Sequence, residues 1–186
     1  METLVIAEHD NESINDLSLC GISAAQKIGN VSVLILGHKC SAAADSACKI
    51  TGVSNVLLAD AEIYEHWLAE DVASLITTLA TDYSHILMVA TTVGKNIMPR
   101  VAAQLDVTQV SDITNVLSDD TFVRPIYAGN AMATVQSTDA IKLLTVRATA
   151  FEPALSAGGS AEIKHISPTG SSGKATFLSR EVTKSE

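Results

Sequence analysis

Basic residues, cysteines and long apolar runs are scarce in this sequence, and each shortage excludes a class of protein. Twelve Lys and Arg stand against 21 Asp and Glu, which gives a formal net charge of −9. Nucleic-acid affinity comes largely from basic residues, so we expect no nucleic-acid partner. The three cysteines form no C-x-x-C pair, which indicates neither a disulfide framework nor a metal site. No apolar run approaches the roughly 20 residues that a membrane span needs, so we expect no membrane insertion.

What the sequence does have is a regular alternation of apolar runs and helical patterns in its first hundred residues. With 186 residues, 47% of them apolar, the chain can build one full-sized core. Each short apolar run is followed by a helix pattern, and parallel neighbours need such crossovers. The alternation predicts a doubly wound α/β domain: a mainly parallel sheet with helices on both faces. Strands are expected at 3–7, 31–36, 56–59 and 86–90, and helices at 13–28, 41–50, 65–83 and from Asn96.

The pattern changes after Asp106, where strand-like segments follow one another without helices. These segments are 113–116, 122–128, 131–136 and 140–146. We expect antiparallel hairpins or edge extensions here, with Gly129 and Asn130 at the centre of a type II′ turn. The nucleotide-binding-like domain should end near residue 152. Residues 153–186 have the composition of a linker and a strand-like tail, with a further short strand at 162–166.

The stretch from Gly94 to Leu105 is the most informative single segment. Gly94 ends the preceding strand, Asn96 is the expected N-cap, and Pro99 belongs near the helix start because it has no amide hydrogen. Lys95 and Arg100 add positive charge beside the free amides, so this helix start can hold an anion or a partner. A phosphate-binding P-loop is excluded, because Val89 and Asn96 stand where the motif needs Gly and Ser or Thr.

Ligands of open parallel sheets bind beyond the carboxyl ends of the strands. At that edge Asp10, Thr91, Thr92 and Gly94 are candidates for contacts with an adenine nucleotide, although the usual glycine-rich turn is missing. His9 beside Glu8 or Asp10 is a weak acid/base candidate, because neighbours at a strand end usually diverge. With no hydrolase elbow or zinc-protease motif present, we assign no catalytic residue.

Five segments in register carry a resemblance to a known family. They are Leu4-Val-Ile-Ala-Glu-His9, Gly94 to Leu105, Val110-Ser-Asp-Ile113, Phe122-Val-Arg-Pro-Ile-Tyr-Ala-Gly-Asn-Ala131 and Val146-Arg-Ala-Thr-Ala-Phe151. In this order they resemble the electron transfer flavoprotein α subunit. The resemblance covers nearly the whole chain.

The resemblance implies a heterodimer that carries FAD and passes electrons from acyl-CoA dehydrogenases of fatty acid β-oxidation to a membrane quinone oxidoreductase. In that family the FAD belongs to a carboxyl-terminal domain of the α subunit, and AMP belongs to the β subunit. The flavin-binding motifs of that domain are absent from these 186 residues. The chain therefore resembles the amino-terminal domain only, for which no cofactor of its own is expected.

The resemblance also gives an expected role and place. The domain would be a non-catalytic scaffold that contacts the β subunit and the FAD domain, in the bacterial cytoplasm or the mitochondrial matrix. Polar residues set among apolar strands and at the helix start are the candidate interface. These are Lys95, Asn96, Arg100, Arg124, Tyr127 and Asn130. The alternative is a free-standing adenine-nucleotide-binding module resembling the universal stress proteins.

Overall fold

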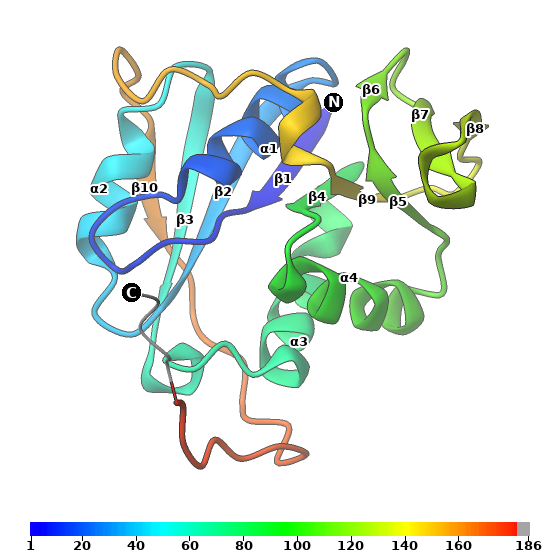
Figure 1. The fold of residues 1–186 in the computed structure, drawn as a ribbon. Helices are drawn as coiled ribbons and strands as arrows, with labels where there is room; N and C mark the ends of the chain where they lie inside the picture. Colours follow the sequence, from blue (N-terminus) through cyan, green and yellow to red (C-terminus); the bar gives the residue numbers. More distant parts are fainter. Residues whose placement is uncertain (182–186) are drawn as a thin grey trace.

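The computed structural model describes residues 1–181, which form a seven-stranded sheet with helices on both faces and a separate three-stranded sheet (Figure 1). The large sheet has the strand order β10-β3-β2-β1-β4-β9-β5, and all its neighbours are parallel. The α/β fold predicted from the sequence is confirmed. The strands of this sheet are β1 (Glu2–Ile6), β2 (Asn30–Gly37), β3 (Val53–Asp60), β4 (His85–Val89), β5 (Gln109–Ile113), β9 (Lys142–Val146) and β10 (Glu162–His165).

Each face of the large sheet carries its own core, because side chains alternate along a strand. In β1, Val5 belongs to the core under α1 (Asp16–Gln26) and α2 (Ser41–Cys48). Its neighbours Leu4 and Ile6 belong to the core under α3 (Ala69–Leu79) and α4 (Thr92–Leu105). These residues are fully buried, so the central strands read as continuous apolar runs.

Two helices begin later than their patterns predict. The first helix was expected from Ser13, but the Asn15 side chain accepts a hydrogen bond from the Leu17 amide and caps α1, which begins at Asp16. The expected helix at 65–83 is divided into a 3-10 turn (Glu62–Tyr64), α3 and a second 3-10 turn (Ala80–Asp82). Because α3 starts at Ala69, residues 65–68 are left at the sheet edge.

The hairpin or edge position expected after Asp106 is wrong for the segment 140–146, which forms β9 inside the large sheet. β9 lies between β4 and β5 and is parallel to both, with Ile86 opposite Leu143 and Val110 opposite Leu144. Leu143 and Leu144 point to opposite faces and are both fully buried. A strand buried on both faces gains more apolar burial than a hairpin arm on the surface, which explains why β9 joins the main sheet.

The prediction holds for the three-stranded sheet, in which β6 (Asn115–Val116), β7 (Thr121–Ile126) and β8 (Ala131–Gln136) are antiparallel. Phe122 is fully buried and joins this sheet to the core of the α1 face. The connection is longer than the two-residue type II′ turn expected: Ile126 pairs with Ala131, so residues 127–130 connect β7 to β8, with a short 3-10 turn (Tyr127–Gly129) among them. Tyr127 and Ala128 have positive φ angles of 49° and 53°, while Gly129 (φ 92°) and the right-handed Asn130 keep the signs of φ expected at the centre of a type II′ turn.

The segment after Phe151 is held against the main sheet rather than apart from it. The expected strand near 162–166 is present as β10, parallel to β3, with Ile163 opposite Val56. The strand-like tail expected from residue 175 is not a strand as far as residue 181, and its last five residues lie outside the described part of the chain. A domain boundary after residue 152 stays a prediction.

Candidate functional site at the carboxyl edge of the sheet

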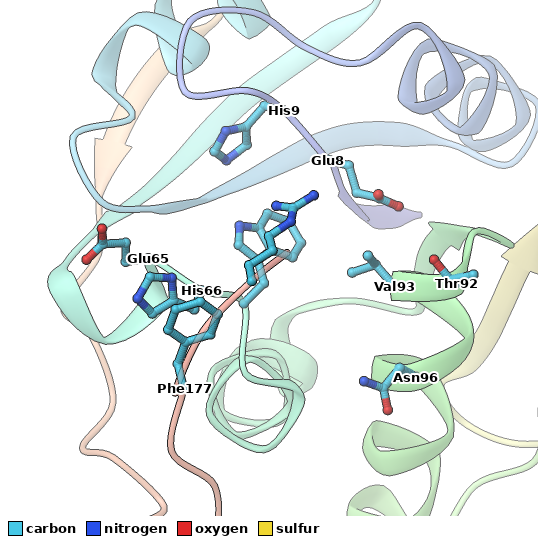
Figure 2. Close-up of a pocket in the computed structure, with 10 residues that line it drawn as sticks. Glu8, His9, Glu65, His66, Thr92, Val93, Asn96 and Phe177 are labelled. Atoms are coloured by element: carbon cyan, nitrogen blue, oxygen red, sulfur yellow. The ribbon is translucent and has the colours of Figure 1, made fainter. Parts of the chain in front are cut away.

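A cavity of about 600 Å³ opens where the strand order reverses, between the ends of β1 and β4 (Figure 2). This is the position at which doubly wound sheets bind ligands. Three parts of the chain meet there: the loop after β1, the residues before α3, and the start of α4, with the tail on one side. The lining residues are Glu8, His9, Glu65, His66, Trp67, Thr92, Val93, Asn96, Phe177 and Arg180.

The start of α4 forms one wall of the cavity and lies earlier than expected. Thr91 is the N-cap, and its hydroxyl accepts the Gly94 amide at 3.0 Å. Asn96 is therefore not the cap, and Pro99 lies inside the helix. A proline in a helix interior costs about 3 kcal/mol, so the burial of residues such as Ile97 and Val101 must outweigh it.

Glu8 lies at the end of β1 and contacts this cap directly. The Thr91 hydroxyl donates to the Glu8 carboxylate, which links the ends of β1 and β4. Burial raises the pKa of the Glu8 carboxyl, and the hydrogen bond from Thr91 opposes that rise. The acidic side chain therefore occupies the place beside a helix N-terminus where an anionic ligand would be expected.

His9 turns away from Glu8, as expected for neighbours at a strand end. Its Nε2 lies 3.0 Å from the Leu36 carbonyl oxygen, and its Nδ1 accepts the Asn11 amide. Its ring meets that of Trp67 edge to face, with the centroids 5.7 Å apart. Burial lowers the His9 pKa, while the Leu36 hydrogen bond and the Asp10 charge raise it. Both nitrogens are thus engaged, which suits a structural role.

The four nucleotide candidates do not come together. Asp10 folds back on its own loop, where its carboxylate accepts the amides of Glu12 and Ser13. Thr91 is used as the helix cap, and Gly94 is buried against Val89. Of the four, Thr92 alone is among the cavity-lining residues. A nucleotide role for these residues stays an untested expectation.

The cavity residues do not fit a flavin dinucleotide. The turn after β1 is Ala7-Glu8-His9, without a glycine over which a pyrophosphate could approach the backbone. The Glu8 carboxylate faces the start of α4, and the tail residues Phe177 and Arg180 line the cavity on another side. A phosphate at the start of α4 would lie beside the Glu8 carboxylate, so this end of the cavity does not suit the pyrophosphate of a flavin dinucleotide.

The candidate interface residues lie in two separate places. On α4, Lys95 and Asn96 are exposed, whereas Arg100 bonds to the Asn96 carbonyl and side-chain oxygens and pairs with Glu70 of α3 at 3.2 Å. On the three-stranded sheet, Tyr127 and Asn130 are exposed in the turn between β7 and β8. Arg124 is half-buried on β7, and its Nε has no partner among the described residues.

His66, Trp67 and Phe177 were not singled out from the sequence. The pattern from Glu65 predicted one amphipathic helix, which assigned Trp67 to a helix rather than to a cavity wall. The signal available was the single tryptophan of the chain just before a run of apolar residues at helical spacing. Phe177 lies about a hundred residues away in the sequence, and no local pattern connects it with His66.

Within residues 1–181, no group of three or more His, Cys, Asp or Glu side chains is placed to hold a metal ion. The three cysteines are unpaired thiols, and burial raises the pKa of Cys40 to about 11. None of the helices in the same range is long and apolar enough to cross a membrane.

Comparison with known proteins identifies the family. The model of the electron transfer flavoprotein domain matches residues 3–170. The chain belongs to this family. It is 50% identical over its whole length to the electron transfer flavoprotein subunit alpha of Pseudomonas aeruginosa, and 44% identical to that of Paracoccus denitrificans. A mitochondrial subunit alpha from Dictyostelium discoideum is 50% identical over 86% of the chain.

The alignments with the two bacterial subunits cover all of this chain but only part of each relative. The chain spans 60% of the length of the two bacterial subunits and 48% of the Dictyostelium one. The predicted resemblance to the α subunit is confirmed.

Proposed function

We propose that this chain is the amino-terminal part of an electron transfer flavoprotein α subunit and acts as a scaffold for the β subunit and the FAD domain. The identity of 44–50% with three subunits named alpha carries this proposal. The full complex would take electrons from acyl-CoA dehydrogenases and deliver them to a quinone oxidoreductase. It would work in the bacterial cytoplasm or the mitochondrial matrix, and this domain would do no chemistry itself.

The three-stranded sheet supports the proposal, because it offers a surface of the right composition for a protein partner. Val123 and Pro125 of β7 stand opposite Thr134 and Met132 of β8 on its outer face, so these positions carry no charge. Met132 is 57% exposed, and Tyr127 in the adjoining turn is 79% exposed. Interface cores are depleted in charged residues and enriched in tyrosine and methionine.

Coexpression with an electron transfer flavoprotein β subunit tests the scaffold role. We expect a 1:1 complex on size exclusion at micromolar concentration. Tyr127→Ala should weaken it about tenfold or more, because exposed aromatic anchors carry much of an interface's energy. Leu155→Ala is the matched control, since Leu155 is 72% exposed in the segment after Phe151. No complex, or equal losses in both variants, would contradict the proposal.

The flavin assignment has its own test. We propose that FAD belongs to the part of the α subunit that the relatives have in addition, and the poor fit of the cavity agrees with this. Purified chain should be colourless after incubation with FAD and gel filtration. A yellow protein with the absorption of bound flavin would contradict this assignment and show that this domain binds FAD.

A further inference from the structure

Beyond β10 the chain crosses the carboxyl edge of the sheet and runs along the start of α3 (Figure 1). Two deeply buried side chains hold it there. The Thr169 amide donates to the Tyr64 hydroxyl at 2.9 Å, and the Ser172 amide donates to the Asp71 side chain at 2.7 Å. Tyr64 is fully buried, and Asp71 is 2% exposed.

These contacts bind the segment to the core of the domain. Buried polar atoms are nearly always hydrogen-bonded, and an atom left without a partner is costly. Asp71 and Tyr64 would each lose a partner if residues 169–172 left the surface. A freely moving linker would not serve as the hydrogen-bond partner of buried side chains. The linker-like composition of this segment therefore does not predict that it is held in place.

A third contact continues the attachment to the cavity. The rings of Phe177 and His66 stack with their centroids 3.6 Å apart and an interplanar angle of 20°. Figure 2 shows the two rings face to face at the rim. Phe177 and Arg180 also line the cavity, so the segment closes one side of it.

We propose that residues 166–180 are a strap, latched by Tyr64, Asp71 and His66, that closes one side of the carboxyl-edge cavity. The chain is therefore held against the domain at least as far as Phe177, and the segment after Phe151 is not a free linker. Any domain that follows in a longer chain is tethered at the cavity rim, close to α3. The strap involves residues 1–181 alone and is independent of the proposed electron-transfer role.

Trypsin tests the strap, because Lys174 lies within it and the latch variants leave that cleavage site unchanged. Phe177→Ala removes the ring stack at a partly exposed site. Tyr64→Phe removes the hydroxyl and keeps the ring. Each should raise the cleavage rate after Lys174 roughly 2- to 10-fold, as expected when one such contact is lost from a locally opening segment. Leu178→Ala is the control, since Leu178 is 89% exposed beside Phe177.

Cleavage after Lys142 in β9 reports global unfolding and should not change in Phe177→Ala. If Tyr64→Phe unfolds the domain, the cleavage rate after Lys174 in Phe177→Ala is by itself the test of the strap. In the unaltered protein we expect cleavage after Lys174 at least tenfold slower than in a peptide of residues 167–181. Equal rates in protein and peptide, or equal rates in Phe177→Ala and Leu178→Ala, would overturn the strap.

Discussion

Gly94 packs so closely on Val89 that a Cβ at Gly94 would lie 2.0 Å from the Val89 carbonyl oxygen. This contact sets the distance between the first turn of α4 and the end of β4. Gly94 therefore has a packing role, whereas the sequence predicted that it would end the preceding strand. The glycine allows the helix to begin at Thr92, directly after the strand.

Gly94→Ala should therefore lower the free energy of unfolding by about 1–3 kcal/mol, because the methyl group forces α4 away from the sheet. Alanine has the better helix propensity, so the loss cannot come from the helix itself. Urea denaturation measures it. Gly170→Ala is the control, since a Cβ there meets nothing within 4 Å. A Gly94→Ala protein as stable as the parent would contradict the packing role.

Glu8 should make the stability depend on pH. Burial raises its pKa above the ordinary value of 4.5, so the folded protein binds this proton more tightly than the unfolded chain. The resulting stabilisation is complete below pH 4.5 and is lost as the pH rises through the folded pKa. Glu8→Gln should thus gain stability relative to the parent between pH 4.5 and 7. A difference that is constant with pH, measured by urea denaturation, would rule this out.

His85, at the start of β4, should make the stability depend on pH in the opposite direction. Its Nε2 bonds to the Asp119 carbonyl oxygen, and burial lowers its pKa below 6.5 while that bond opposes the shift. The unfolded chain then binds the proton first, so stability falls as the pH drops from 6.5 through the folded pKa. His85→Gln should cost about 1–2 kcal/mol at pH 7 and remove this loss. Thermal unfolding from pH 7 to 5 gives the comparison.

Arg100 and Lys95 lie on the same helix, and substituting each compares a cation held in an ion pair with an exposed one. Arg100→Ala removes the ion pair with Glu70 and should lower the unfolding free energy by about 0.5–1 kcal/mol. Lys95→Ala should stay within about 0.5 kcal/mol of the parent. A double-mutant cycle with Glu70→Gln isolates the pair. Coupling of zero would show that the α3–α4 contact does not use this ion pair.

The sequence predicted the part of the fold in which the alternation of strands and helices also determines which strands are neighbours in the sheet. β1 to β4 alternate with helices, and their parallel order follows from those crossovers. The same reasoning failed for β9, because nothing local in Lys142–Val146 tells which strands it pairs with. It failed at Asn96, because the rule on proline considered the helix start alone and not the burial of Ile97 and Val101.

The site was predicted less well than the fold. The carboxyl edge was expected to be the functional edge, and the cavity lies there, with Thr92 among its walls. Trp67 comes from a segment assigned to a helix, and Phe177 comes from one assigned to a strand-like tail. Their meeting with His9 and His66 depends on tertiary contacts that periodicity and composition do not encode.

The place of β9 in the sheet has a consequence for synthesis on the ribosome. Its partner β4 is complete more than fifty residues before β9 emerges, and β5 has no partner in the large sheet without β9. Until Val146 leaves the exit tunnel, β4 exposes an apolar edge with unpaired amides, which is a template for aggregation. Folding of this domain should therefore be late and of high contact order, because β9 and then β10 pair with strands that were synthesised long before them.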